Sequence, residues 1–375
     1  MARATWVATA VQMPSRPVAD AADRAAAWNR IHENLDVALS MAESALRQHR
    51  PDLLLFPEFA FQGPPRGRGA REWIDLACCP VPGPITEPLQ SLATAKRVYV
   101  AGNQFEWDPE WPAAFFNTSF LIDPGGDLLL RYRRVNTTMA VSPHDLMTEY
   151  LARYGLGGSF PVAATELGRL AIVPCGELSV PEAVRAVVLR GAEVILHPTN
   201  ERRSKLQELS KIARALENLV FVVSANVAGL AGADTDGTAL AGCSKIVDFG
   251  GSVLADAGPG ADPDLVTAEI DVDGLRQARA STRPSNRLLY GRFEMYAPLY
   301  ASARLYPGDR LRGGKAPSQA EAAAAQQEAR ENLARLGLLQ PTEGAPLCQQ
   351  EADNGRPDAG AQVAAVPSDG GRTAG

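Results

Sequence analysis

The sequence predicts an α/β fold whose strands are divided between two sheets. Short apolar stretches typical of buried strands alternate with stretches of helical periodicity along most of the 375 residues. The segment 169–185 shows this pattern most clearly. Its apolar residues 170–174 predict a buried strand, and a helix begins near Pro181. The number of predicted strands favours two sheets over one.

The other elements follow from the hydrophobic spacing, taken in chain order. Residues 5–13 predict the first strand, and the apolar residues of 20–49 recur at helical spacing, which predicts a long helix. The same patterns predict a helix at 205–218 and strands at 52–56, 97–105, 116–122, 128–132, 193–197, 219–225, 244–249 and 265–270. The strand–helix–strand units near the start and around Cys175 are similar enough to suggest two pseudo-symmetric halves.

The composition changes after residue 306, which predicts three parts. We expect one domain over 1–306 and a partly helical extension over 307–340, where residues 319–339 are rich in Ala, Glu and Arg. Residues 341–375 are rich in Gly, Pro, Ala and Asp, which predicts disorder because such a segment cannot bury enough apolar surface.

Charge and cysteine content exclude several classes of protein. The 37 basic and 43 acidic residues give a net charge of −6, which argues against nucleic acid as a partner. The five cysteines show no spacing typical of a disulfide framework or a zinc site. The chain has no apolar stretch of bilayer-spanning length, and its first residues favour a strand over a signal peptide. We therefore expect a cytoplasmic protein with no membrane partner.

Two strand ends carry side chains suited to catalysis. Cys175 follows a buried strand at a tight turn beside Gly176, the edge at which open α/β sheets place their chemistry. Its thiolate could face a cleft, with free backbone N–H groups around Gly176 available to an oxyanion. Glu58 ends the strand at 52–56, where partial burial would raise its pKa and suit it to take a proton from a thiol. An inert buried thiol and a surface carboxylate are the alternatives.

Five segments in this order resemble the nitrilase, or carbon–nitrogen hydrolase, superfamily. The resemblance covers nearly all of 7–306 and implies a four-layer αββα sandwich of two mixed sheets. It is nearest to the amidase branch. The matching segments are FPE at 56–58, FNTSFLIDPGGDLLLRYRR at 116–134, PCGELSVPE at 174–182, ARALENLVFVVSAN at 213–226 and GCSKIVDFGGSVLADA at 242–257.

The resemblance assigns roles to three residues. It implies that Cys175 attacks an amide or nitrile carbon and that Glu58 accepts the thiol proton and returns it to the leaving amine. The family's oxyanion-stabilising lysine corresponds to Arg134, and the chain has no lysine between Lys96 and Lys205. An arginine keeps the positive charge and the hydrogen-bond donors but cannot give up its proton.

The resemblance also implies a second glutamate, which is displaced in this sequence. The stretch from Ser142 fits a helix N-terminus with Asp145 as a capping residue, so Glu149, one turn further on, is our candidate. His144 lining the pocket is an open alternative. Gly176, His197 and Asn200 fall where the family binds substrate, although the last two could equally be wall residues satisfied by backbone.

These observations predict a thiol amidohydrolase acting on a small amide or nitrile, without metal or organic cofactor. The alternative is a catalytically impaired or repurposed member that acts as a binding or biosynthetic-accessory protein, because the lysine is replaced and the second glutamate displaced. We also expect a homodimer or higher homo-oligomer. The helices after Cys175 and His197 are rich in Ala, Val and Leu on one side, and the aromatic segment 287–306 is predicted to be an arm that packs on another surface.

Overall fold

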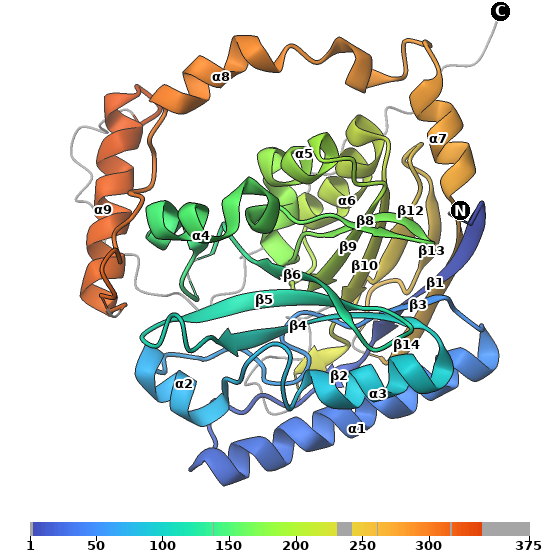
Figure 1. The fold of residues 1–375 in the computed structure, drawn as a ribbon, viewed down its shortest axis with the longest axis horizontal. Helices are drawn as coiled ribbons and strands as arrows, with labels where there is room; N and C mark the ends of the chain where they lie inside the picture. Colours follow the sequence, from blue (N-terminus) through green and yellow to red (C-terminus); the bar gives the residue numbers. More distant parts are fainter. Residues whose placement is uncertain (1–2, 138, 231–241, 261, 316, 340–375) are drawn as a thin grey trace, which may run out of the picture.

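Two six-stranded mixed sheets stack face to face, and helices cover their outer faces (Figure 1). The computed structural model describes residues 3–137, 139–230, 242–260, 262–315 and 317–339. This is the predicted four-layer αββα arrangement, so the fold class expected from the sequence is confirmed. A two-stranded pair, β2 (Pro14–Ser15) with β11 (Gly229–Leu230), lies outside the two large sheets.

The first sheet has the strand order β14-β1-β3-β4-β5-β6. Its three central strands are parallel, and the outer strands pair antiparallel. Its outer face is covered by α1 (Arg24–Gln48), α2 (Ala70–Ala77) and α3 (Thr86–Lys96). The strands are β1 (Thr5–Gln12), β3 (Leu53–Leu55), β4 (Tyr99–Trp107), β5 (Phe115–Ile122), β6 (Leu128–Arg133) and β14 (Asp264–Asp271).

The second sheet has the order β13-β12-β10-β9-β8-β7, with β8, β9 and β10 parallel. Helices α5 (Pro181–Leu189) and α6 (Lys205–Asn218) pack on its outer face. The strands are β7 (Ala163–Thr165), β8 (Gly168–Ile172), β9 (Val194–Thr199), β10 (Phe221–Asn226), β12 (Lys245–Val247) and β13 (Val253–Asp256). Each sheet therefore has a parallel centre flanked by antiparallel strands, as expected for two related halves.

The main core lies between the sheets, where side chains from both inner faces interdigitate. Leu55 and Leu121 of the first sheet belong to the same buried cluster as Ile172 and Leu196 of the second. Two further clusters lie between each sheet and its helices. Because both faces of the central strands are covered, their sequences are nearly continuous apolar runs, which made them recognisable.

The C-terminal part runs away from the sandwich as a long arc (Figure 1). The segments η1 (Pro143–Leu146) and α4 (Met147–Ser159) lie near its far end. A helix was expected at 319–339 and is observed as α9, whereas the segment 341–375, expected to be disordered, lies outside the described residues. The arc consists of α7 (Val272–Ala280), η3 (Arg287–Tyr290), α8 (Phe293–Ser302) and α9 (Gln319–Arg335). No helix in the described part of the chain is long and apolar enough to span a bilayer.

Candidate active site

Three side chains from both sheets meet where their strands end. Glu58 follows β3, and Arg134 follows β6 of the first sheet. Cys175 follows β8 of the second sheet and opens the 3-10 turn η2 (Cys175–Ser179), which leads into α5. The structure thus brings together the three residues that the sequence assigned to the chemistry. Glu58 is fully buried, and Arg134 and Cys175 line one cavity.

The backbone at Cys175 is strained. Its φ of 50° lies in the left-handed region, which non-glycine residues rarely occupy. The neighbouring Val173 and Leu178 are buried in the core below α5, so packing on both sides of the turn holds it in place. The thiol Sγ lies 3.9 Å from the carbonyl oxygen of Asn200. The turn therefore presents the thiol at the cavity instead of in the core.

Glu58 has the surroundings of a proton acceptor. Its Oε1 accepts hydrogen bonds from Asn117 Nδ2 at 2.7 Å and from Arg134 Nη1 at 3.1 Å. Its Oε2 has no hydrogen-bond partner among the described residues. Burial raises the pKa of the carboxyl, although Arg134, the Cys175 thiol and Asn117 all act to lower it. One oxygen is thus anchored, while the other remains available.

The Cys175 thiol is held in its protonated form. Burial raises its pKa, and the negative charges of Glu58 and Glu201 raise it further, while Arg134 acts in the opposite direction. A nucleophilic thiolate at this position therefore has to form by transfer of the proton to a neighbouring base. Glu58 lies close enough to the thiol for each group to shift the pKa of the other, and it is the base available to take that proton.

The three nitrogens of the Arg134 guanidinium lie against three different groups. Its Nε donates to the carbonyl oxygen of Asn136 at 2.9 Å, and its Nη1 binds Glu58. A Cβ added at Gly176 would lie 3.3 Å from Nη2, so this third nitrogen lies against the turn that carries Cys175. Arg134 thus presents one free donor edge to the place where charge would develop on a reacting carbonyl.

Glu177 is a positioning residue that the sequence analysis did not single out. Its fully buried carboxylate accepts from the backbone N–H groups of Val135 and Asn136, at 3.1 and 2.7 Å, and from Asn136 Nδ2 at 3.0 Å. It also accepts from the hydroxyl of Tyr132 at 2.8 Å. Because the carbonyl oxygen of Asn136 in turn binds Arg134, Glu177 fixes the position of residues 134–136 relative to the thiol. Its place two residues after the nucleophile was the available signal.

The cavity beside Cys175 has a volume of about 320 Å³, within the range of small-molecule sites. The predicted substrate-binding residues Gly176, His197 and Asn200 all line it. His197 is buried, and its Nδ1 lies 2.8 Å from the carbonyl oxygen of Val173. The other lining residues are Arg134, Met139, Cys175, Leu178, Ser179, Glu201, Ser204, Leu206, Gln207 and Ser210.

The structure does not bring Glu149 into this group, which corrects the expectation for the second carboxylate. Glu149 lies on α4, and its Oε1 accepts from the backbone N–H of Gly313 in the C-terminal extension at 3.1 Å. The N-terminal cap explains the orientation: Ser142 and Asp145 form the expected capping box. Arg310 also pairs with Asp145, so the extension covers this side of η1. The carboxylates found near Cys175 are instead Glu58, Glu177 and Glu201.

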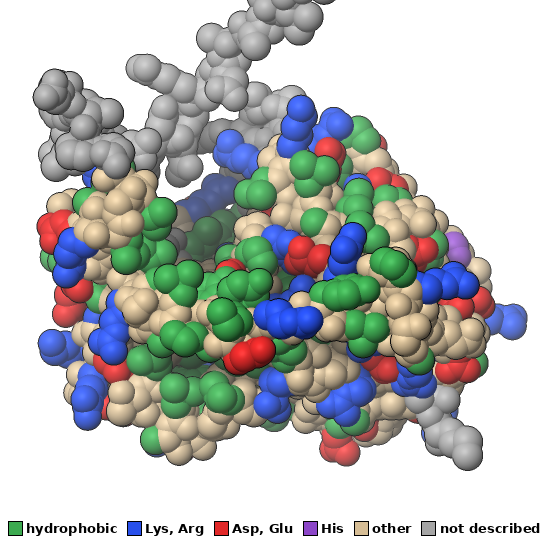
Figure 2. Space-filling view, turned by 90° about the horizontal axis from the view of Figure 1, so that it is seen from above, with side chains coloured by type: hydrophobic (Ala, Val, Ile, Leu, Met, Phe, Trp, Pro, Cys, Tyr) green, Lys and Arg blue, Asp and Glu red, His purple; other side chains and the backbone are tan. Residues whose placement is uncertain are grey.

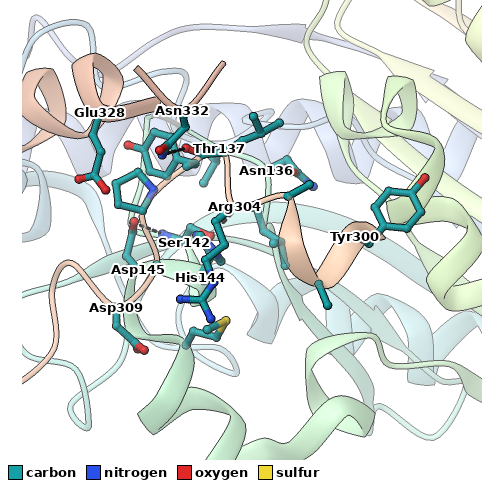
Figure 3. Close-up of a pocket in the computed structure, with 18 of the residues that line it drawn as sticks. Asn136, Thr137, Ser142, His144, Asp145, Tyr300, Arg304, Asp309, Glu328 and Asn332 are labelled. Carbon is teal, nitrogen blue, oxygen red and sulfur yellow. Dashed lines mark hydrogen bonds between the residues drawn. The ribbon is translucent and has the colours of Figure 1, made fainter. Parts of the chain in front are cut away.

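A second, larger cavity of about 1130 Å³ separates the C-terminal arc from the sandwich. Figure 3 shows side chains from the loop after β6, from η1, from the region of α8 and from α9 converging on it. His144 lines this cavity and not the one beside Cys175, so the structure does not place His144 in the substrate pocket, which was the open alternative. Asn136 also lines the larger cavity, and its neighbours through hydrogen bonds are Arg134 and Glu177.

Comparison with known proteins gives formamidases among the relatives of this chain. The chain is 28% identical over 234 residues to formamidases of Bacillus cereus and Bacillus thuringiensis, covering 61% of this chain and 64% of those proteins. The match thus spans slightly less than two thirds of the length of these curated relatives.

Solved structures share the fold. Nit3 of Saccharomyces cerevisiae, a member of branch 10 of the nitrilase superfamily, superposes with a TM-score of 0.59 at 20% identity, covering 76% of this chain and 97% of that one. An amidase mutant from Nesterenkonia sp. AN1 gives 0.58 at 22% identity, with 79% and 97% covered. The carbon–nitrogen hydrolase family model matches residues 7–280, which include the entire site described above. The chain therefore belongs to the carbon–nitrogen hydrolase family.

Proposed function

We propose that this protein is a cysteine-dependent amidohydrolase that cleaves the C–N bond of a small non-peptide amide or nitrile. One observation carries the proposal: a thiol at a strained turn, a buried carboxylate whose charge acts on the pKa of that thiol, and a guanidinium bound to the carboxylate share one small site. The formamidase relatives and the Nesterenkonia structure, in which an acetamide moiety is attached to the active-site cysteine, support this reaction class.

In the proposed acylation step each of these groups has one role. Glu58 takes the proton of the Cys175 thiol as Sγ attacks the amide carbon. The negative charge that develops on the amide oxygen is stabilised by the free Nη2 of Arg134 and by backbone N–H groups of the Gly176 turn. Collapse of the tetrahedral intermediate breaks the C–N bond. Glu58 returns the proton to the leaving nitrogen, which departs as ammonia or an amine and leaves a thioester on Cys175.

Deacylation repeats the same roles with water as the nucleophile. Glu58 takes a proton from water, whose oxygen attacks the thioester carbon, and Arg134 again stabilises the oxyanion. The C–S bond then breaks, the carboxylic acid leaves, and the proton returns to the thiol. Arg134 stays protonated and transfers no proton in either step: burial acts to lower its pKa, but the surrounding negative charges outweigh burial and raise this already high pKa.

The test is ammonia release from a panel of short aliphatic and aryl amides and nitriles, with Cys175→Ala as the blank. We expect turnover by the natural protein and none by Cys175→Ala or Cys175→Ser, with both variants folded by circular dichroism. Trapping of an acyl group on Cys175 by mass spectrometry identifies the thioester. Ammonia release at the level of the blank across the whole panel would instead favour a repurposed binding protein.

A further inference from the structure

Two buried polar atoms face each other in the wall of the Cys175 cavity. Because a carbonyl oxygen only accepts, the contact of His197 Nδ1 with Val173 O requires the proton on Nδ1. The other ring nitrogen, Nε2, lies 3.7 Å from Glu201 Oε2. Neither atom has a hydrogen-bond partner among the described residues.

Glu201 is built into this position. Its backbone N–H donates to Asn226 Oδ1 at 3.1 Å, and its carbonyl oxygen accepts from Asn226 Nδ2 at 2.9 Å. The residue is only 8% exposed, so its carboxylate has little freedom to turn toward solvent. Leaving such a carboxylate oxygen unsatisfied is costly, which makes the arrangement a site that awaits a donor.

The carboxylate of Glu201 carries its charge. Burial acts to raise its pKa, but the facing His197, the positive charge of Lys211 and the hydroxyl of Thr199 outweigh burial and hold the pKa below its ordinary value. Lys211 is itself buried, and burial lowers its pKa. Lys211 does not form an ion pair with Glu201 Oε2, which has no hydrogen-bond partner among the described residues.

The other charges around the cavity are already paired. Arg134 forms an ion pair with Glu58, and the carboxylate of Glu177 accepts four hydrogen bonds. On the rim, Arg203 pairs with the exposed Glu208 of α6 at 3.2 Å. Among the described residues, the buried polar atoms of this wall without a hydrogen-bond partner are Glu201 Oε2, His197 Nε2 and Asn200 Nδ2, and Glu201 is the one that carries a charge.

The wall lies where the acyl part of a substrate would be held. Resting on the proposed function, Glu58 of the first sheet protonates the leaving nitrogen, so the leaving group lies on its side of Cys175. Glu201 follows β9 of the second sheet, and the carbonyl of the preceding Asn200 is 3.9 Å from Sγ. The connection between β9 and α6 therefore contacts the group on the other side of the reacting carbon.

We propose that Glu201 and His197 recognise an amino group on the acyl part of the substrate. The substrate class is then a small amide with a protonated amine a few bonds from the carbonyl. An ammonium beside the two side chains donates a charge-assisted hydrogen bond to Oε2 and pairs the carboxylate of Glu201. The 320 Å³ cavity, about twice the ~150 Å³ that holds a benzene ring, is large enough for a small acyl part.

The experiment compares two isosteric amides, 3-aminopropionamide and butyramide, which differ by an ammonium in place of a methyl group. We expect a higher kcat/KM for the amino compound with the natural protein. Glu201→Gln keeps the size and removes the charge, and it should reduce the ratio of the two kcat/KM values by roughly 10–100-fold. Glu208→Gln, which removes the same charge from the surface of α6, is the matched control and should leave the ratio unchanged.

The outcomes separate this proposal from the proposed function. An unchanged ratio in Glu201→Gln, or an equal loss for both amides, overturns the recognition of an amine. If neither amide is hydrolysed above the Cys175→Ala blank, binding of 3-aminopropionamide to Cys175→Ala is measured by calorimetry. Weaker binding when Glu201→Gln is added, but not Glu208→Gln, supports the recognition site without the hydrolysis. Equal binding by both double variants overturns it.

Discussion

At the scale of single residues, the proposed chemistry depends on Arg134, which stands where the resemblance predicts a lysine. Its planar fork holds Glu58, anchors the following loop and still presents Nη2 toward the nucleophile turn. A lysine has one nitrogen and could not make these three contacts in the same directions. The neighbouring Arg133 points the other way, because side chains alternate along β6, and it pairs with the buried Glu106.

Replacing Arg134 tests its role as an oxyanion donor. Arg134→Met should lower kcat by roughly 10²–10³ with little change in KM, because the lost interaction is made in the transition state. Arg134→Lys keeps the charge on a shorter reach and should give reduced but measurable turnover. The measurement is steady-state ammonia release. Unchanged rates in Arg134→Met would remove Arg134 from the mechanism while leaving Cys175 and Glu58 in it.

The pH dependence of kcat/KM tests the role of Glu58 as the base. Glu58 accepts a proton only when ionised, and burial raises its pKa, so kcat/KM should fall as the pH decreases through a value above the ~4.3 of an ordinary glutamate. Arg134 acts to lower this pKa, so the acidic limb of Arg134→Met should move to higher pH. Glu149→Gln, outside the cavity, is the control and should keep the natural profile. A limb that Arg134→Met leaves in place would contradict the assignment.

At the scale of elements, periodicity located most of the fold. The bounds predicted for α6 agree with the structure, and the long helix predicted at 20–49 begins four residues later, after the cap Asp23. Helices α2 and α3 were not predicted because they are short or carry no long apolar stripe, whereas the helix expected to begin at Ser142 is observed as η1 followed by α4. Their positions depend on packing against the first sheet and on contacts with the C-terminal extension, which a local pattern does not contain.

From the sequence, residues of the site could be predicted only where a reactive side chain directly follows a strand. Glu58 and Cys175 follow apolar runs, so their meeting at one edge could be inferred from sheet geometry and from the family resemblance. Glu201 lies in a connection whose direction is fixed by Asn226, a contact between residues 25 positions apart. The prediction that Glu149 is the second carboxylate was wrong for the same reason. Helical spacing places Glu149 near Asp145 but does not say which surface that face of α4 meets.

At the scale of the whole molecule, the C-terminal arc leaves a large apolar surface open. Helix α8 buries none of its residues, and the exposed fractions of Met295, Leu299 and Tyr300 are 73, 67 and 60%. Figure 2 views the molecule from the side of the arc, and hydrophobic side chains lie there among Lys and Arg. Soluble monomers rarely expose contiguous apolar surface of this kind. We propose that a second copy of the chain covers it.

The homo-oligomer expected from the sequence can be tested on this surface. Sedimentation velocity at micromolar concentration should give at least a dimer for the natural protein, because burying α8 removes its apolar side chains from water. Met295→Lys combined with Leu299→Lys should shift the population toward monomer, since two ammonium groups would have to be desolvated in the interface. Leu129→Lys, at an exposed leucine of β6, is the matched control and should leave association unchanged. A monomer in the natural protein, or equal association of all three proteins, would show that α8 is not the contact surface.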